Sequence, residues 1–466
     1  MVYPFTESTR TNMETTDNTY QETFDVEQEE AILWPWFERI YFFVMLIYAA
    51  QMTQDTARMV GNLSGNPIPF LIPILLTIIL LFRNPISFAD KRLWALLGIT
   101  GLWSISSIVK YNAFSNQELS YHFFLYYAII IAYIHIKVYD TDLMTLYEKT
   151  MVTMCKITLP LWLLCVIAPL ITHQFFTAFP ETGFGNNFLY IFNYMDPSKG
   201  QEFRNAGFSW EPGRFAIMIA LAIYCNLLQN GIDIRSKRLW ILLAAMASTM
   251  STTGYSVTFI ILLLFYIKNL SLGKGMLLTI IIVPLATYVY SLDFMGDKIG
   301  AQIDKASNTS SLDFKYTNKK HNDGEYAFSL DRFPSMIFEW ENIKKDPILG
   351  YSRNHDHSFF YQNVSKNVVL TGGLLKSIGE FGIIFALFIY FALIKSSRKE
   401  AQLFGNGSDM TLFFTLIVCS VSYPVFGIPI FTAFWFNGLF CNDEDEYILE
   451  GENYIENEYS PEAISK

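Results

Sequence analysis

The polar segment at residues 203–214, FRNAGFSWEPGR, carries side chains whose types and spacing suit chemistry on an anionic group. Arg204 lies beside glycine and aromatic residues, a setting suited to a fixed guanidinium whose planar donors match phosphate oxygens. Glu211 is a candidate general base. Because Pro212 favours the first turn of a helix, Glu211 also falls at a helix N-terminus, where it would act as a cap. Arg214 is either a ligand for the anion or an anchor at a membrane interface.

A second polar segment begins near Arg332. Residues 335–345 have helical periodicity with one apolar face, so we expect an amphipathic helix lying on a membrane surface. Pro347 and Gly350 are expected to end this helix. The apolar face comprises Met336, Ile337, Trp340 and Ile343.

Two histidines, His355 and His357, follow that helix with Asp356 between them. In an extended segment, residues two apart point to the same side, so the pair could hold a metal ion. Two histidines without a second cluster of ligands make a weak metal site, and we expect neither a metal nor another cofactor. We expect instead a single catalytic or hydrogen-bonding histidine and assign that role to His357; the alternative is that both are solvated.

The elements that must position these side chains are transmembrane helices. Of the 466 residues, 52% are hydrophobic and 16% are charged, whereas a soluble domain has about 25% charged residues. The apolar residues form long uncharged blocks that suit helices crossing about 30 Å of hydrocarbon. We therefore predict an all-α, polytopic integral membrane protein with about 12 transmembrane helices. The expected centres lie near residues 45, 75, 101, 128, 163, 221, 244, 261, 284, 386, 416 and 433.

Short basic loops mark the cytoplasmic side of a membrane protein. With these spans, four basic loops and both termini fall on one side. The basic residues are Arg83, Lys91 and Arg92, then Arg235, Lys237 and Arg238, then Lys268 and Lys274, and finally Lys395, Arg398 and Lys399. Two large loops, at about 175–213 and 293–367, are then extracytoplasmic and hold the polar segments described above.

The chain divides into a membrane domain at residues 36–441 and two acidic cytoplasmic tails, at 1–35 and 442–466. The tails carry much of the net charge of −10, and we expect them to be solvated and disordered. The first tail has no cationic, apolar signal sequence. We expect no nucleic-acid partner. Five cysteines without motif spacing are best interpreted as small core residues: Cys155, Cys165, Cys225, Cys419 and Cys441.

Together these segments resemble the O-antigen polymerase and O-antigen ligase superfamily of bacterial polysaccharide enzymes. The family's first loop motif is matched by Arg204, Gly207, Phe208, Glu211 and Pro212. Its Ser/Thr-rich turn is matched by Ser251, Thr252, Thr253, Gly254 and Tyr255. Its second loop motif is matched by Arg332, Trp340, the segment from Asp346 to Tyr351, and His357 with Ser358. In this last motif Asp346 stands where the family has asparagine.

The resemblance implies a glycosyltransferase that acts on an undecaprenyl-diphosphate-linked oligosaccharide at the outer face of the bacterial cytoplasmic membrane. Departure of the lipid diphosphate builds negative charge, which a metal ion or guanidinium groups must neutralise. Neither large loop contains an Asp-x-Asp metal site, so the resemblance assigns this role to Arg204 and Arg332 in a metal-independent reaction. Either Glu211 or His357 would serve as general base for the acceptor hydroxyl.

Further residues of the two loops are candidate substrate contacts: Arg214, Trp210, Tyr351, Arg353 and His355. The aromatic residues could stack on sugar rings, or they could belong to an interfacial aromatic belt. The partners implied by the resemblance are the lipid-linked oligosaccharide, membrane lipid, a chain-length regulator and a flippase.

Three functions are consistent with the resemblance. A polymerase joins repeat units into O-antigen, capsular polysaccharide or exopolysaccharide, a ligase transfers the glycan to a lipid A core, and a flippase transports the lipid-linked oligosaccharide. Ligases tend to have a glycine shortly after their His-Asn pair, whereas Gly372 and Gly373 come later here, which favours the polymerase. A flippase needs charged residues within its spans, and the few candidates, Lys156 and Lys376, fall near span ends.

Overall fold

Helices make up most of the structure, which is a computed structural model. It describes residues 35–50, 68–182, 185–197, 203–268, 328–329, 332–363, 368–370, 373–423 and 425–441. These residues cover most of the predicted membrane domain. Of the two predicted tails, only Pro35 lies within them.

Long apolar runs in the first part of the sequence form successive helices, separated by short polar turns. They are α2 (Pro35–Ala50), α4 (Ile68–Arg83), α5 (Lys91–Tyr111), α6 (Asn116–Tyr139), α7 (Asp142–Ile167) and α8 (Pro169–Phe176). The second part contains α9 (Pro212–Asn230), α10 (Lys237–Ser248), α11 (Thr252–Lys268), α15 (Arg332–Lys345), the 3₁₀ turn η3 (His355–His357), α16 (Phe359–Asn363), α17 (Gly373–Phe404), α18 (Thr411–Ser422) and α19 (Pro429–Phe440).

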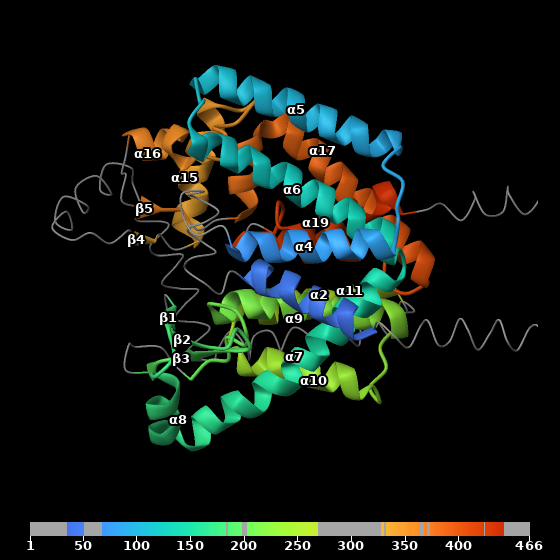
Figure 1. Ribbon diagram of the computed structural model, residues 1–466, viewed down its shortest axis with the longest axis vertical. Helices are drawn as coiled ribbons and strands as arrows, with labels where there is room; N and C mark the ends of the chain where they lie inside the picture. The colour runs from blue at the N-terminus through green and yellow to red at the C-terminus, as the bar shows by residue number, and fades with distance from the viewer. Residues whose placement is uncertain are drawn as a thin grey trace, which may run out of the picture.

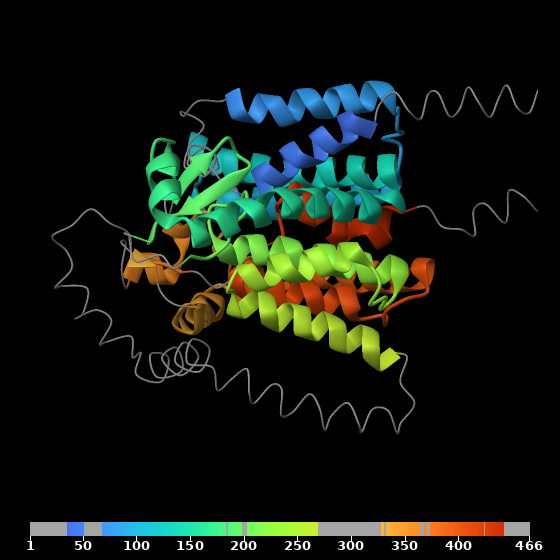
Figure 2. The ribbon, with the colours of Figure 1, turned by 90° about the horizontal axis from the view of Figure 1, so that it is seen from below.

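The long helices lie side by side and run between two ends of the molecule (Figures 1 and 2). Contacts between helix termini give their directions. Near the end of α6, Lys137 Nζ lies 3.6 Å from Asp90 Oδ2 at the start of α5. At the other end of α5, the Tyr111 hydroxyl donates to the Gly350 carbonyl over 3.0 Å. Helices α5 and α6 are therefore antiparallel, and α5 ends beside the second polar segment.

Several helices end together at the opposite end of the bundle from the polar segments. Lys268, the last residue of α11, donates from Nζ to the Gly405 carbonyl over 2.8 Å. Asn406 donates from Nδ2 to the carbonyl of Leu228, near the end of α9, over 3.0 Å. The basic turn between α9 and α10 therefore lies at the same end as Lys268, as the predicted topology requires.

One predicted basic loop is wrong. Lys395, Arg398 and Lys399 lie within α17, which continues to Phe404. The apolar run of α17 ends before these residues, but lysine, arginine, glutamate and alanine are all good helix formers and extend the helix. The basic residues still lie at the end of α17 that faces Lys268, because the chain turns only at Gly405.

Among the described residues, five helices are long and apolar enough to cross a membrane. They are α5, the Leu119–Tyr139 part of α6, α7, α9 and α17. Shorter apolar helices lie within α4, α11 and α18. The protein is therefore mostly helical with several apolar helices of spanning length, as predicted for the fold class. Of the predicted centres, the one near 284 lies outside the described residues, and each of the others falls within a helix.

Small β-structures interrupt the helical pattern, and the sequence analysis did not predict them. Strands β1 (Glu181–Thr182), β2 (Gly185–Phe188) and β3 (Phe192–Met195) form an antiparallel sheet inside the first large loop. Strands β4 (Phe328–Ser329) and β5 (Val368–Val369) pair in parallel. These strands lie in the connections between helices, so the architecture remains helical.

The core is centred on α9, where 83% of the apolar segment is buried. A Cβ added to Gly254 of α11 would lie 2.6 Å from the Cβ of Ala216 in α9, so glycine is what lets these two helices approach. The five cysteines are buried free thiols, as predicted for core residues.

Two glutamates lie inside the bundle, where the sequence analysis predicted few charges. Glu148 of α7 accepts a hydrogen bond from Arg238 Nη1 over 2.9 Å and one from Asn226 Nδ2 over 2.9 Å. Glu400 of α17 accepts one from the Tyr224 hydroxyl over 2.6 Å. Both residues are fully buried. Their hydrogen bonds link α7 to α9 and α10, and α9 to α17.

Candidate functional site

Both polar segments lie at the same end of the helix bundle. Strands β1–β3, which belong to the first large loop, lie at the same end as α15 and α16 of the second (Figures 1 and 2). This is the placement that the predicted topology requires. The candidate side chains of the two loops are therefore carried by one end of the molecule.

Arg204 is held against the turn between α10 and α11. Its Nε donates to the Thr249 carbonyl over 3.1 Å. The next residue, Asn205, donates from its backbone N–H to the Ser248 carbonyl over 2.9 Å. The Arg204 loop thus contacts the residues that directly precede the Ser/Thr-rich turn at 251–255, although some forty residues separate the two segments in the sequence.

The backbone of the Arg204 loop is fixed by a buried asparagine of strand β3. Asn193 donates from its backbone N–H to the Gly207 carbonyl over 2.6 Å. Its side-chain Nδ2 donates to the carbonyls of Ser209 and Trp210 over 3.1 and 3.0 Å. The small sheet therefore acts as a support that sets the path of the loop before α9 begins. Sequence reasoning did not identify Asn193.

Glu211 occupies the N-cap position of α9, as predicted, but its side chain makes no capping hydrogen bond. Its carboxylate instead lies 3.6 Å from Arg214 Nε, one helical turn away, and is 35% exposed. A residue that only capped the helix would direct its oxygen at the backbone N–H groups. The geometry therefore leaves the Glu211 carboxylate available for a role beyond capping.

Arg214 is packed between two aromatic rings. Its guanidinium carbon lies 4.6 Å from the centre of the Trp210 ring and 4.0 Å from that of the Tyr423 ring. Its side chain is only 12% exposed. Stacking of this kind fixes the plane of a guanidinium while leaving its edge for in-plane hydrogen bonds. The geometry does not fit an arginine that anchors the helix in lipid head groups.

The second polar segment fills a break in α17. Gly382 has φ 75° and ψ 165°, which is not helical, so α17 is two helical pieces joined at this residue. Ile383 N–H donates to the Pro347 carbonyl over 2.7 Å, and Tyr351 N–H donates to the Gly379 carbonyl over 2.8 Å. The loop thus satisfies backbone groups that the break leaves without helical partners.

Glycine is required on both sides of this contact. A Cβ on Gly382 would collide with the Ile348 carbonyl, and a Cβ on Gly350 would collide with the carbonyls of Gly379 and Glu380. Both glycines also have positive φ. The Asp-Pro-x-x-Gly-Tyr motif that carries the resemblance is therefore the segment that docks into α17.

Arg353 follows this docked segment and is half-buried. Its Nη1 donates to the Tyr121 carbonyl over 3.3 Å, and its Nη2 would lie 3.5 Å from a Cβ on Gly427. Burial lowers the pKa of Arg353, and the charge of Glu380 acts in the opposite direction. An arginine remains protonated under these conditions, so Arg353 presents a permanent positive charge.

Arginines of the two loops lie near the two ends of one turn, between α18 and α19. Arg214 stacks on Tyr423, at the start of this turn, and Arg353 lies close to Gly427, near its end. Four residues of chain span at most about 14 Å. One arginine from each loop therefore lies near this turn. They are not the pair, Arg204 and Arg332, to which the resemblance assigns the binding of the diphosphate.

The buried side of α15 combines polar and apolar residues, with Phe338 and Ile343 each 3% exposed. Ile337 and Trp340 are 40% and 53% exposed, whereas Glu339 and Asn342 are buried. Burial raises the pKa of Glu339 to about 7, against the charge of Lys376 and the hydrogen bond from Asn342, which lower it. The sequence places the polar residues Glu339 and Asn342 three positions apart, on one side of a helix. The analysis of hydrophobic periodicity did not use this pattern.

Tyr351 belongs to this buried group. Its hydroxyl lies 3.3 Å from each carboxylate oxygen of Glu339, and the residue is 1% exposed. The ring therefore has no exposed face on which a sugar could stack. Nearby, Lys376 Nζ lies 3.7 Å from Glu380 Oε1. Tyr351 holds Glu339 in place between α15 and α17, which the sequence analysis did not predict.

His357 lies against the end of α5. Its ring stacks on Tyr111 with the ring centres 4.3 Å apart and the planes inclined by 17°. The Tyr111 hydroxyl donates to Asp346 Oδ2 over 3.0 Å, and Lys110 pairs with the same carboxylate. Through Tyr111 and Asp346, His357 is thus connected to the start of the docked loop. Tyr111 and Lys110 belong to the charged and polar side chains around His357.

The expectation of an extended backbone at the histidine pair is wrong. His355–His357 form a 3₁₀ turn, not an extended segment, so residues two apart do not point to the same side. The side chains of His355 and Arg332 lie outside what the structure describes. No group of three or more metal-ligating His, Cys, Asp or Glu residues occurs within the described ranges.

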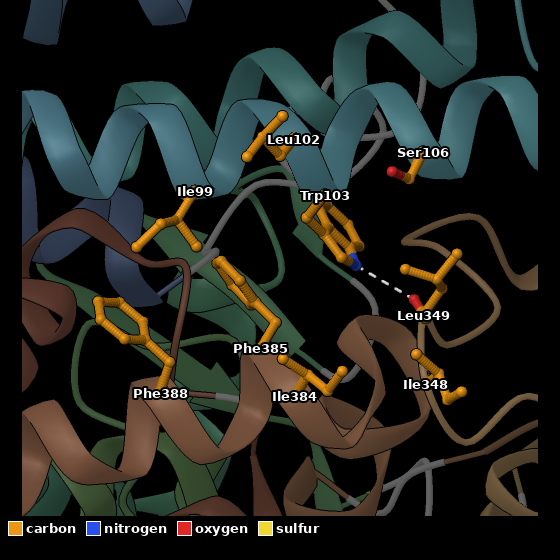
Figure 3. Close-up of a pocket in the computed structure, with 9 residues that line it drawn as sticks. All are labelled: Ile99, Leu102, Trp103, Ser106, Ile348, Leu349, Ile384, Phe385 and Phe388. Atoms are coloured by element: carbon orange, nitrogen blue, oxygen red, sulfur yellow. Dashed lines mark hydrogen bonds between the residues drawn. The ribbon is translucent and has the colours of Figure 1, made fainter.

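A groove lies beside the docked loop, on the outer surface of the bundle between α5 and α17 (Figure 3). Its volume is about 360 Å³. Leu102 of α5 and Ile384 of α17 lie on its opposite walls, Trp103 and Phe385 stack on each other at its floor, and Leu349 of the docked loop lies at one end. The lining is almost entirely apolar.

The arrangement is suited to binding an anion at the rim of a membrane domain. Fixed guanidinium groups bind phosphate oxygens through charge-assisted hydrogen bonds, and Glu211 or His357 could accept a proton near them. Comparison with known proteins gave no match, whether to family models, to curated proteins or to solved structures.

Proposed function

We propose that this protein is a membrane glycosyltransferase that polymerises undecaprenyl-diphosphate-linked oligosaccharide repeat units at the outer face of the bacterial cytoplasmic membrane. The product is O-antigen, capsular polysaccharide or exopolysaccharide. The observation that carries the proposal is that Arg214 and Arg353, from two separate loops, lie near the two ends of the turn between Tyr423 and Gly427, at one end of the bundle.

The chemistry explains why such a pair is needed. When the acceptor hydroxyl attacks the first sugar, the bond to the lipid diphosphate breaks and negative charge grows on the departing oxygen. Guanidinium groups that are already held in place stabilise this charge without reorganising. Arg214 is held by two rings and Arg353 by the Tyr121 carbonyl. Arg204 and Arg332 complete the set of candidate cations in our proposal.

The acceptor hydroxyl needs a proton acceptor, for which Glu211 and His357 are the candidates. Glu211 lies beside Arg214, with its Oε1 3.6 Å from Arg214 Nε. His357 lies on the Arg353 side, stacked on Tyr111. We favour Glu211, because its partly exposed carboxylate makes no capping hydrogen bond and is next to one of the paired arginines.

Transport of the lipid-linked oligosaccharide is the second candidate function. The buried Glu148 and Glu400 favour it, because ionisable side chains inside a membrane bundle often mark a pathway. However, both carboxylates accept hydrogen bonds from neighbouring helices and lie toward the basic end, away from the arginines. They are better explained as links between helices. A flippase would lose transport in Glu400→Gln, whereas a polymerase that folds would keep elongating.

A deletion strain tests the proposal. For a polymerase, electrophoresis of surface polysaccharide should show glycan shortened to one repeat unit. Long chains stranded on the lipid diphosphate would indicate the ligase. Complementation with Arg353→Ala should leave the short glycan, and complementation with Arg235→Ala, an exposed arginine at the opposite end, should restore long chains.

A further inference from the structure

We propose that the groove between α5 and α17 binds the isoprenoid chain of the lipid-linked substrate and directs its diphosphate toward Arg353. This inference rests on the proposed function, because that function supplies the polyprenyl diphosphate. It adds a chain-binding site, formed by residues to which the reaction chemistry assigns no role.

The groove opens toward the hydrocarbon of the bilayer. Both walls belong to helices of spanning length, and only 33% of the apolar segment of α5 and 44% of that of α17 are buried. Leu102 and Ile384, on opposite walls, are 70% and 67% exposed. An apolar groove at this place in a membrane is filled by hydrocarbon, since water there would gain no partners.

The lining also selects against a polar ligand. The Trp103 Nε1–H, which points into the groove, donates to the Leu349 carbonyl over 3.1 Å (Figure 3). The main polar groups at this end are therefore paired with each other. Phe385 packs on Trp103 with ring centres 5.6 Å apart, so the floor is an aromatic surface. Such a surface suits a branched hydrocarbon chain.

The docked loop connects the groove to the arginines. Leu349 lines the groove, and Arg353 lies four residues further along the same loop, at most about 14 Å away. Between them, the Gly350 carbonyl accepts hydrogen bonds from Tyr111 and Lys110 at the end of α5. A lipid whose chain lies in the groove therefore has its head group at the end of the bundle that carries the candidate site. This continuity argues for the chain of the substrate over that of a bulk lipid.

Photocrosslinking tests the proposal directly. The full-length protein in nanodiscs is irradiated with a polyprenyl diphosphate that carries a diazirine on its first isoprene units, and adducts are mapped by mass spectrometry. We expect adducts in residues 99–106 and 383–388. Excess unlabelled polyprenyl diphosphate should displace the probe, whereas the same amount of phosphatidylglycerol should not.

Groove-filling variants provide the matched comparison. Leu102→Trp and Ile384→Trp should reduce the adducts roughly tenfold, because the larger side chains occupy the space of the chain. Ile105→Trp and Leu387→Trp, at 62% and 63% exposed positions that do not line the groove, should leave adduct formation unchanged. Adducts confined to other helices would overturn the proposal. Equal displacement by phosphatidylglycerol would do so too, since it would make the groove a site for bulk lipid.

The outcome can be separated from that of the proposed function, because the probe carries no sugar and needs no glycosyl transfer. Groove adducts in a protein whose deletion leaves surface glycan unchanged would keep a polyprenyl diphosphate site and reject the polymerase. A deletion that leaves glycan one repeat long, without groove adducts, would keep the polymerase and reject the groove.

Discussion

Glu339 is a buried acid beside the docked loop, hydrogen-bonded to Tyr351, and its environment gives the protein a specific pH dependence. Burial raises its pKa from the ordinary 4.5 to about 7. The titratable groups around it are Tyr351, Lys376 and Glu380. Between pH 4.5 and 7 the folded protein keeps a proton that the unfolded chain has released.

The sign of the effect follows from this proton. Because the folded state binds more protons in that range, stability falls as the pH rises from about 5 to about 7, by a total of about 3 kcal/mol. Glu339→Gln should remove this slope, as measured by thermal unfolding in detergent across pH 5 to 8. Glu341→Gln, an exposed neighbour on the same helix, should keep it. An unchanged slope in Glu339→Gln would show that Glu339 does not titrate there.

The second prediction at the scale of single residues concerns the arginines. Arg214→Lys and Arg353→Lys should each lower the rate of chain elongation by roughly 100- to 1,000-fold, because an ammonium group does not replace a planar, stacked guanidinium. Elongation is measured with the purified protein and a lipid-linked repeat unit. Arg235→Lys is the control. Full activity in Arg353→Lys would reduce this residue to a structural role.

At the scale of elements, the break in α17 is the feature on which the site depends. The loop at Pro347–Tyr351 leads to Arg353. It docks into α17 only because Gly382 breaks the helix and Gly350 allows the close approach of the two backbones. The sequence contains these glycines but does not show that they lie at one contact between the loop and α17. A contact between residues some thirty positions apart cannot be derived from local periodicity, which is why the sequence predicted the turn but not its docking.

Substitution of these glycines tests the docking. Gly382→Ala should destabilise the protein by at least about 2 kcal/mol, because the methyl group would collide with the Ile348 carbonyl and φ is positive. Gly98→Ala in α5, where a Cβ meets nothing within 4 Å, is the matched control and should be neutral or stabilising. Both are measured by thermal unfolding in detergent. Equal stability of the two variants would contradict the docked loop.

Periodicity and composition predicted the helices well, because apolar blocks of membrane length leave the backbone few alternatives. They failed where tertiary contacts decide. Glu339 and Asn342 of α15 are buried because Tyr351 and the Phe360 N–H supply hydrogen bonds from neighbouring elements. Arg214 is enclosed because Tyr423 comes from a distant turn. The candidate residues of the first loop could be named from the sequence, but the placement of Arg214 and Arg353 near one turn required the structure.

For the whole molecule, the arrangement predicts which end faces outward. The end that carries strands β1–β3 and α15 should be extracytoplasmic, and the end with the basic turn between α9 and α10 cytoplasmic. A cysteine at Tyr190, which is 46% exposed, should react with an impermeant thiol reagent on intact cells. A cysteine at Ile234, which is 72% exposed, should not. The native cysteines are buried, so background labelling of their thiols should be low. The reverse labelling pattern would invert the topology.

The central claim is that arginines from two loops of one membrane protein drive the polymerisation of lipid-linked repeat units. The most direct measurement supplies purified protein in nanodiscs with an undecaprenyl-diphosphate-linked repeat unit and follows lipid-linked chain length by mass spectrometry. The account predicts chains of two or more repeats with the wild type and with Arg235→Ala, and none with Arg214→Ala or Arg353→Ala. Failure of the wild type to extend the chain, or equal extension by the two arginine variants, would contradict it.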